Sequence, residues 1–244
     1  MKAVAASWKL LRALVHMLAG WITIRLVFPG LGQAERDLRV QAWAQRLLHL
    51  LGLDIEVTGA APVAGPLLLV ANHISWLDIV LMHAGRHCRF VSKSDVRHWP
   101  LIGTLATGAG TLYIERESRR DAMRVVHHMA ESLSAGDILA VFPEGTTSDG
   151  VSLLPFHANL LQAAISADAP VQPVALSFLD ARSRLPSRAP CYIDDDTLLG
   201  SIWRTLATPG IVAVVRYGEP QRARGRDRRA WAAALRDEVV QLRA

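Results

Sequence analysis

The amino-acid sequence predicts an α/β fold, with a mixed central sheet flanked by helices and preceded by a helical N-terminal segment. Three observations lead to this prediction. The length of 244 residues suits one large domain better than two independent ones. Seven short apolar runs recur after residue 52, and helical patterns fall between several of them. Strands that alternate with helices along a chain form a sheet with crossover connections.

The first helix is predicted over residues 8–28. This stretch is apolar, but Arg12 and Arg25 interrupt it, so it lacks the roughly 20 consecutive apolar residues of a membrane span. A helix lying in the membrane interface would place such cations, together with Trp8 and Trp21, at the level of the lipid headgroups. A secretory signal is disfavoured because no small-residue cleavage site follows the run. A helix buried in the globular core is the alternative.

The second helix is predicted over residues 34–53. Its apolar residues have the spacing of an amphipathic helix and fall near one face: Leu38, Trp43, Leu47, Leu48 and Leu51. Two helices ahead of the first strand predict a membrane-attachment module over residues 1–53. The α/β domain is then expected over residues 54–244.

The predicted strands follow in order along the rest of the chain. They cover residues 53–59, 66–72, 88–93, 110–116, 138–145, 171–178 and 211–218. A helix is expected from Ser118, with Gly136 as its natural stop. The segment from Asp180 to Pro209 is rich in Arg, Ser and Pro and is predicted to be a long surface excursion.

The charge pattern limits the classes of partner. The formal net charge is +5, and five arginines lie within residues 221–229. Such a cluster can hold an anionic lipid surface or nucleic acid, although it is more often a solvated loop. We expect no nucleic-acid partner because no recognised binding motif accompanies the cluster. Two distant cysteines, Cys88 and Cys191, predict a reducing compartment, so the active part should face the cytoplasm.

The first candidate site lies in "NHISWLDI", residues 72–79, directly after an apolar strand. His73 and Asp78 are five residues apart, about 140° on a regular helix, so they can pair only if His73 precedes the helix. Ser75 as N-cap, with Asp78 three residues later, gives a capping-box pattern and a purely structural role for Asp78. In the functional interpretation Asp78 accepts a bond from one nitrogen of His73, which leaves the other nitrogen as a base.

Only a few reaction types fit a histidine–aspartate pair in this sequence. The sequence contains no Gly-x-Ser-x-Gly elbow, no cysteine beside His73 and no histidine set with metal-ligand spacing, so no metal is expected. A base without a protein nucleophile suits direct attack by a substrate hydroxyl, or by water, on an activated group. A thioester is activated enough for a base and oxyanion stabilisation to suffice.

Four sequence blocks then carry a family resemblance. They are "NHISWLDI" at 72–79, "GTLYIERES" at 110–118, "VFPEGTTSDG" at 141–150 and "VQPVAL" at 171–176. In this order and at these spacings they resemble the blocks of the glycerophospholipid acyltransferases, and most of all the bacterial 1-acyl-sn-glycerol-3-phosphate acyltransferases. The resemblance implies a single glycerolipid-acyltransferase-like domain.

The resemblance also implies roles for the first two blocks. His73 would deprotonate the free hydroxyl of a lysolipid, and Asp78 would orient His73 and stabilise its charged form. Glu115 and Arg116 of the second block would lie in the acceptor site. Arg116 would pair with a phosphate through its planar guanidinium.

In the third block the resemblance implies that Glu144 binds the polar head of the acceptor and that Gly145 allows close backbone approach. Thr146 and Thr147 complete the expected substrate-binding set. The family usually has arginine at the position of Thr147, and a threonine brings no charge. Phosphate recognition would then rest on Arg116 and other cations. Versions with a neutral hydroxyl occur in relatives that resemble lyso-ornithine lipid acyltransferases.

The function implied by the resemblance is acyl transfer to the sn-2 hydroxyl of 1-acyl-sn-glycerol 3-phosphate, which forms phosphatidate. The expected co-substrate is acyl-CoA or acyl carrier protein, with no other cofactor. The expected partners are membrane lipids, at the cytoplasmic face of the inner membrane of a bacterium. The alternatives are another acceptor such as lyso-ornithine lipid, a hydrolase that uses the same base on water, and a membrane lipid-binding protein without catalysis.

Overall fold

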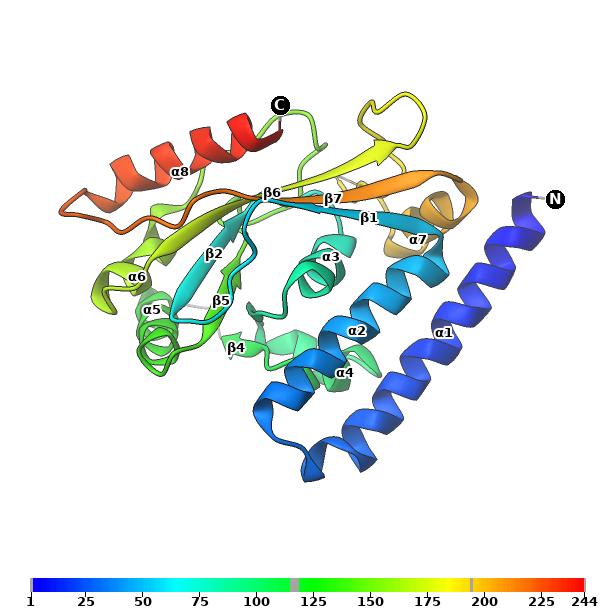
Figure 1. Ribbon diagram of the computed structural model, residues 1–244, viewed down its shortest axis with the longest axis horizontal. Coiled ribbons are helices and arrows are strands. Elements are labelled where there is room, and N and C mark those ends of the chain that lie inside the picture. The colour runs from blue at the N-terminus through cyan, green and yellow to red at the C-terminus, as the bar shows by residue number, and fades with distance from the viewer. Residues whose placement is uncertain (1, 115–118, 194, 244) are drawn as a thin grey trace.

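The structure is a computed structural model that describes residues 2–114, 119–193 and 195–243. Its strands form one seven-stranded sheet (Figure 1). They are β1 (Leu53–Thr58), β2 (Leu67–Ala71), β3 (Arg89–Lys93), β4 (Leu112–Ile114), β5 (Ile138–Val141), β6 (Val171–Asp180) and β7 (Ile211–Tyr217). The helices are α1 (Lys2–Leu26), α2 (Gln33–Leu51), α3 (Leu77–Gly85), α4 (Ile102–Gly108), α5 (Arg119–Ser134), α6 (Leu161–Ser166), α7 (Leu198–Ala207) and α8 (Arg228–Arg243).

The sheet is mixed, as predicted, and has the order β1-β7-β6-β2-β5-β3-β4. Strands β6, β2, β5, β3 and β4 run parallel to one another. Strand β7 is antiparallel to β6, and β1 pairs in parallel with β7. The carboxyl ends of β2, β5, β3 and β4 therefore lie along one edge, which we call the carboxyl edge. Ligands of parallel sheets bind at such edges.

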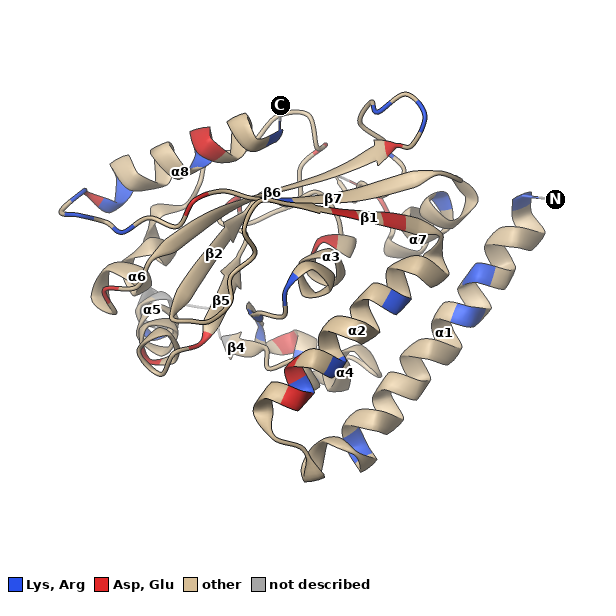
Figure 2. Ribbon diagram, viewed as in Figure 1, with Lys and Arg blue, Asp and Glu red and all other residues tan. Residues whose placement is uncertain are grey.

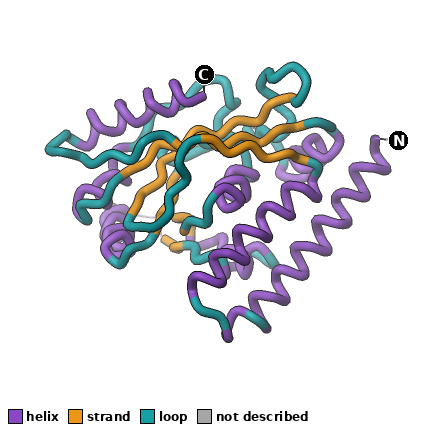
Figure 3. Tube along the Cα trace, in the orientation of Figure 1, coloured by secondary structure: helices purple, strands orange, loops and turns teal. Residues whose placement is uncertain are grey.

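Helices cover both faces of the sheet because its central strands are apolar on both sides. In β2, Leu67, Leu69 and Ala71 pack into the cluster that contains α1, α2, α3 and α7. The alternate residues Leu68 and Val70 pack into the cluster formed with α5, α6 and α8. The tube view shows the strands enclosed between these two sets of helices (Figure 3).

The structure confirms six of the seven predicted strands to within a few residues. The seventh, predicted over 110–116, is β4, and its predicted end lies outside the described residues. The prediction of a surface excursion from Asp180 to Pro209 is wrong in its second half. Helix α7 lies there, capped by the Thr197 hydroxyl, which accepts the Gly200 N–H at 3.1 Å. The sequence pattern does not indicate this helix, because its buried face includes the hydroxyl residues Ser201 and Thr205 rather than an apolar stripe.

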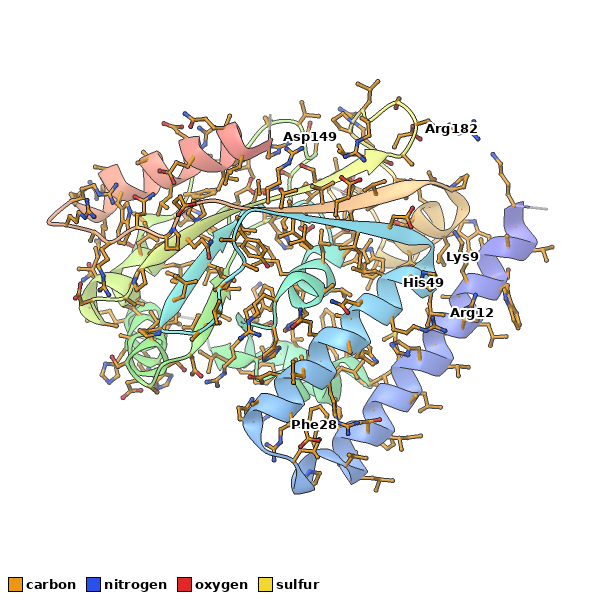
Figure 4. All side chains as sticks on the ribbon, viewed as in Figure 1. Lys9, Arg12, Phe28, His49, Asp149 and Arg182 are labelled. Atoms are coloured by element: carbon orange, nitrogen blue, oxygen red, sulfur yellow. The ribbon has the colours of Figure 1, made fainter. Side chains whose placement is uncertain are left out.

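Helix α1 lies on the surface and buries one face made of small residues. Ala6, Ala13 and Gly20 are buried, at a spacing of seven, and a Cβ at position 20 would lie 2.5 Å from Nε1 of Trp43 on α2. Phe28 is buried at the turn between α1 and α2 (Figure 4). The alternative of a core helix is therefore wrong. None of the helices within the described ranges is long and apolar enough to cross a membrane.

The outward face of α1 is an apolar stripe at helical spacing. Its exposed members are Val4, Trp8, Leu11, Val15, Leu18, Ile22 and Leu26. The helix contains no acidic residue. The arginines of residues 221–229 lie before α8 and in its first turn, at the opposite end of the molecule from α1 (Figure 2). They therefore do not form one surface with α1.

Candidate active site

The site begins where β2 ends, at a residue that fixes the chain before it turns. Asn72 is fully buried, and its side chain pairs with the backbone of Leu176 on β6. The amide nitrogen donates to the Leu176 carbonyl at 3.1 Å, and the amide oxygen accepts the Leu176 N–H at 2.8 Å. The side chain thus continues the ladder between β2 and β6. The next residue, His73, consequently leaves the sheet at a fixed point of the carboxyl edge.

His73 and Asp78 form the pair that the sequence predicts. Nδ1 of His73 lies 2.7 Å from Oδ2 of Asp78, and Asp78 is fully buried in the first turn of α3. The same Oδ2 accepts the backbone N–H groups of Ile74 at 2.6 Å and Ser75 at 2.8 Å. Asp78 therefore orders the turn and orients the imidazole together. With Nδ1–H donating to the carboxylate, Nε2 is the nitrogen left to accept a proton.

The predicted capping pattern is present, although the assigned N-cap of α3 is Trp76, one residue later. The Ser75 hydroxyl accepts the Leu77 N–H at 3.2 Å, and Asp78 accepts the Ser75 N–H in return. The Ser75 hydroxyl also donates to the carbonyl of Pro190 at 2.5 Å. The remote carbonyl draws the hydroxyl into a tertiary contact that sequence spacing does not reveal.

An aromatic wall sets the plane of the imidazole. The Phe142 ring stacks on the His73 ring, with centroids 4.1 Å apart and an interplanar angle of 4°. Phe90 on β3 stacks behind Phe142 at 5.5 Å. The His73 side chain stays 21% exposed. The imidazole is thus held by an ion pair at one nitrogen and by an apolar face, and it retains access to solvent.

Glu144 follows β5, and both of its carboxylate oxygens accept backbone hydrogen bonds within the site. Its Oε1 accepts the His73 N–H at 2.7 Å, and its Oε2 accepts the Leu154 N–H at 2.8 Å. Glu144 is only 4% exposed, and this burial raises the pKa of its carboxyl, an effect that the two backbone bonds partly oppose. In this geometry Glu144 positions His73. Its contact with an acceptor head stays a prediction.

Of the four residues after Glu144, the first two are exposed to solvent and the last two hydrogen-bond to neighbouring segments. Gly145 and Thr146 are exposed. Gly145 has φ +74°, and a Cβ there would lie 3.2 Å from Cδ2 of His157, so the close approach it permits is that of His157. The Thr147 hydroxyl donates to the Tyr192 carbonyl. Ser148 donates to the His73 carbonyl through its N–H at 2.8 Å and its hydroxyl at 3.1 Å.

Ser148 is the second residue that hydrogen-bonds to the backbone of His73, and the sequence pattern does not predict this role. Glu144 accepts the N–H of His73, and Ser148 donates to its carbonyl, so the loop after β5 holds both backbone polar groups of the base. The signal was present, since Ser148 follows the predicted set directly. Its role depends on the pairing of β2 with β5, and nothing in the spacing of the two blocks specifies that pairing.

Glu115 and Arg116 lie outside the described residues. The strand before them, β4, pairs in parallel with β3, with Ile114 opposite Lys93. Strand β4 therefore ends at the carboxyl edge, two strands away from β5. A place for the second block beside His73 and Glu144 stays a prediction. Lys93 itself is exposed at this edge.

The second missed feature is the segment 187–192, which we call the strap. The N–H of Tyr192 donates to the Ile74 carbonyl at 3.2 Å, and the Pro190 carbonyl accepts the Ser75 hydroxyl. The strap thus lies against the turn between His73 and Asp78. It has no periodic pattern and falls within the part of the sequence that was predicted to be a surface loop.

Comparison with known proteins gives one family. The family model described as Acyltransferase matches residues 54–177. The lyso-ornithine lipid O-acyltransferase of Pseudomonas aeruginosa is 40% identical to this chain, over 86% of this chain and 81% of that protein. The 1-acyl-sn-glycerol-3-phosphate acyltransferase of Neisseria gonorrhoeae is 38% identical, over 71% of this chain and 68% of that protein.

A solved structure shares the fold. The crystal structure of the 1-acyl-sn-glycerophosphate acyltransferase from Thermotoga maritima superposes with a TM-score of 0.64 and covers 95% of each chain, at 21% sequence identity. The likeness extends beyond the segment matched by the family model. It includes the N-terminal helices and the C-terminal strand and helix.

Proposed function

The chain belongs to the acyltransferase family, and on that premise we propose that it transfers an acyl group from a thioester to the free hydroxyl of a membrane lysolipid, with His73 as general base. The observation that carries the proposal is the pair formed by Nδ1 of His73 and the buried Asp78 at 2.7 Å. This pair fixes the tautomer that leaves Nε2 to accept a proton.

The reaction follows from this geometry. The acceptor hydroxyl gives its proton to Nε2 of His73 while its oxygen attacks the thioester carbonyl carbon. The tetrahedral adduct collapses, the C–S bond breaks, and the thiolate takes the proton back from the imidazolium. Asp78 stabilises the imidazolium while it exists. The chain supplies no nucleophile in this scheme, so no acyl-enzyme forms.

For the acceptor we propose 1-acyl-sn-glycerol 3-phosphate, acylated at its sn-2 hydroxyl to give phosphatidate. The donor is acyl-CoA or acyl carrier protein, and no metal or further cofactor takes part. Relatives that are named as acyltransferases of this acceptor, and the order of the four sequence blocks, support the proposal.

A lyso-ornithine lipid is the second candidate acceptor. The side chain at position 147 favours it, because Thr147 carries no charge and its hydroxyl already donates to Tyr192. The similarity to the lyso-ornithine lipid O-acyltransferase of Pseudomonas aeruginosa points the same way. Both acceptors carry an acyl chain, a free hydroxyl and an anionic group, which is a phosphate in one and the carboxylate of a zwitterionic head in the other, so the reaction is the same for each.

We propose that α1 docks the enzyme on the cytoplasmic face of the bacterial inner membrane. The apolar stripe of α1 and the absence of acidic residues from that helix support this placement. Both lysolipid and product reside in the bilayer, whereas a thioester donor arrives from the aqueous side. An interfacial helix would hold the carboxyl edge within reach of both.

An acceptor panel tests the proposed function. The purified protein is given acyl-CoA or acyl carrier protein with 1-acyl-sn-glycerol 3-phosphate, lyso-ornithine lipid or no acceptor. Thiol release is followed, and the products are identified by mass spectrometry. We expect acceptor-dependent release and one preferred acylated lipid. Thiol release without acceptor would indicate a hydrolase, and vesicle binding without release for any acceptor would indicate a lipid-binding protein.

A further inference from the structure

The strap is bonded to both loops that form the site. Pro190 accepts the Ser75 hydroxyl at 2.5 Å, beside the base. On the other side, the Tyr192 carbonyl accepts the Thr147 hydroxyl. The strap therefore bridges the turn after β2 and the loop after β5, and a side chain on it has a fixed position relative to His73.

Helix α7 hydrogen-bonds to the middle of the strap. Arg204 donates from Nε to the Ala189 carbonyl at 3.1 Å and from Nη2 to the Cys191 carbonyl at 2.6 Å. The Ser201 hydroxyl lies 3.1 Å from the same Cys191 carbonyl. Residues 189–191 are buried. Because its middle is anchored in this way, the strap presents its first residues to solvent from a rigid base.

Arg188 stands at the exposed start of this anchored segment. Its side chain is 74% exposed, and its Nη2 is 3.8 Å from Oδ2 of Asp149, too far for a hydrogen bond. Asp149 is mainly engaged in its own turn, because its Oδ1 accepts the N–H groups of Val151 at 2.8 Å and Ser152 at 3.2 Å. The guanidinium of Arg188 thus forms a long, solvent-exposed ion pair with Asp149 but donates no hydrogen bond to it, next to the loop that contains Thr147.

Two other cations near the carboxyl edge are less suited to a ligand. Arg243 on α8 is half-buried, its Nη2 donates to the Gly150 carbonyl, and burial lowers the pKa of its guanidinium. Lys93 is the last residue of β3, on the far side of β5 from His73. Of the three, Arg188 alone is both open to solvent and bonded through its segment to the turn that contains the base.

We propose that Arg188 binds the anionic head group of the acceptor and sets the preference of the enzyme for anionic over neutral acceptors. The inference rests on the proposed function and names the substrate class at that same site. The planar guanidinium can donate two parallel hydrogen bonds to a phosphate or to a carboxylate. The positive charge that Thr147 does not supply comes, in this arrangement, from the neighbouring strap.

The test compares Arg188→Gln with the matched control Arg182→Gln. Arg182 lies in the same excursion and is exposed, but it sits on the loop beyond β6, away from Asp149 (Figure 4). Three acceptors are assayed in the same mixed micelles: 1-acyl-sn-glycerol 3-phosphate, lyso-ornithine lipid and an uncharged monoacylglycerol. For Arg188→Gln the ratio of kcat/KM, anionic acceptor over neutral acceptor, should fall about tenfold or more. Arg188→Lys should keep only part of the ratio, because lysine retains the charge but not the two parallel donors, and Arg182→Gln should keep all of it.

The outcomes separate binding from a loosened structure. A disturbed strap would lower kcat/KM for all three acceptors in parallel, and an unchanged ratio in folded Arg188→Gln overturns the proposal. A higher KM for acyl-CoA with an unchanged acceptor ratio also overturns it, since the anion would then belong to the donor. The anionic acceptor whose ratio falls identifies the head group as phosphate or carboxylate.

Equilibrium binding distinguishes a failure of this inference from a failure of the proposed function. Binding of 1-acyl-sn-glycerol 3-phosphate is measured without donor, for the unaltered chain and for Arg188→Gln. Binding that weakens about tenfold in the variant supports the inference even if no acyl transfer occurs. Equal binding by the two proteins contradicts the inference even if transfer is active.

Discussion

At the scale of single residues, four neighbours restrain the ring and the backbone of His73. Asp78 accepts from its ring, Phe142 stacks on it, and Glu144 and Ser148 bond its backbone. Together the contacts restrain the tautomer, the ring plane and the path of the chain. If His73 is the base, it is preorganised, which lowers the cost of reaching the reactive geometry.

Asp78→Asn should lower kcat while the protein stays folded. An asparagine oxygen can still accept the N–H groups of Ile74 and Ser75, but a neutral amide no longer stabilises the imidazolium. We expect a fall of roughly 100-fold or more in kcat, with a thermal midpoint within a few degrees of that of the unaltered protein. Initial rates of thiol release and thermal unfolding provide the two measurements. A rate within tenfold of the original would show that the charge of Asp78 is not needed.

Glu144→Gln should reduce both stability and rate. A glutamine side chain has one acceptor and one donor end, so it cannot accept from both His73 and Leu154. A buried N–H is left unpaired, which costs about 1–3 kcal/mol. Urea unfolding measures the loss. Glu131→Gln is the control, because the Glu131 side chain is 61% exposed. Equal stability of the two variants would contradict the role given to Glu144.

At the scale of elements, the sequence predicts what periodicity and burial determine. The run that becomes β2 is apolar throughout, and those that become β6 and β7 are mostly apolar, because helices cover both faces of these strands. The pair His73 and Asp78 could be placed because it lies within one turn. The roles of Ser148, Arg188 and the strap could not, because each depends on contacts between segments more than 40 residues apart. Residue spacing contains no information about such contacts.

Helix α3 also places an acid-sensitive group in the core. His83 is buried, its ring stacks 5.1 Å from that of His87, and its edge meets Phe90. Burial lowers the pKa of His83 from 6.5 to about 3, and the neighbouring His87 adds to the effect. The folded state thus keeps His83 neutral where the unfolded chain takes up a proton.

The sign of the pH effect follows from this pKa. Between pH 6.5 and about 3 the unfolded state binds more protons, so stability falls as pH falls across that window. The loss approaches roughly 4 kcal/mol at its lower end, counting about 1.4 kcal/mol for each unit. His83→Phe should therefore flatten the acid side of the curve of thermal midpoint against pH. An unchanged slope between pH 6.5 and 4 would show that His83 is not the group responsible.

At the scale of the whole molecule, three groups of features lie in different places. The carboxyl edge holds the base and the strap, α1 presents its apolar stripe outward, and the arginines of 221–229 lie at the end of the molecule opposite α1 (Figure 2). If the enzyme docks through α1, those arginines face away from the bilayer. The cluster is then better explained as a solvated loop, since Arg222 pairs with Asp168 at 3.0 Å and Arg226 bonds Gln221 at 2.6 Å.

The double variant Leu11→Ser with Leu18→Ser should detach the enzyme from vesicles. Both side chains are about half exposed on the stripe of α1, so their loss removes apolar area that would otherwise be buried in lipid. We expect the fraction bound to anionic vesicles to fall about tenfold, measured by co-sedimentation. Leu185→Ser is the control, because Leu185 is equally apolar and exposed but lies on the loop after β6. Equal binding by the two proteins would place the attachment surface elsewhere.

If the enzyme docks through α1, the stripe of that helix also determines which concentration the enzyme responds to. A catalyst held in the plane of the bilayer meets its acceptor by lateral diffusion, so the mole fraction of lysolipid in the surface governs the rate, rather than the amount per volume of solution. Adding inert phospholipid at a constant total amount of lysolipid would then slow the reaction. Docking through this one helix would thus turn a reaction in solution into one whose rate is set by membrane composition.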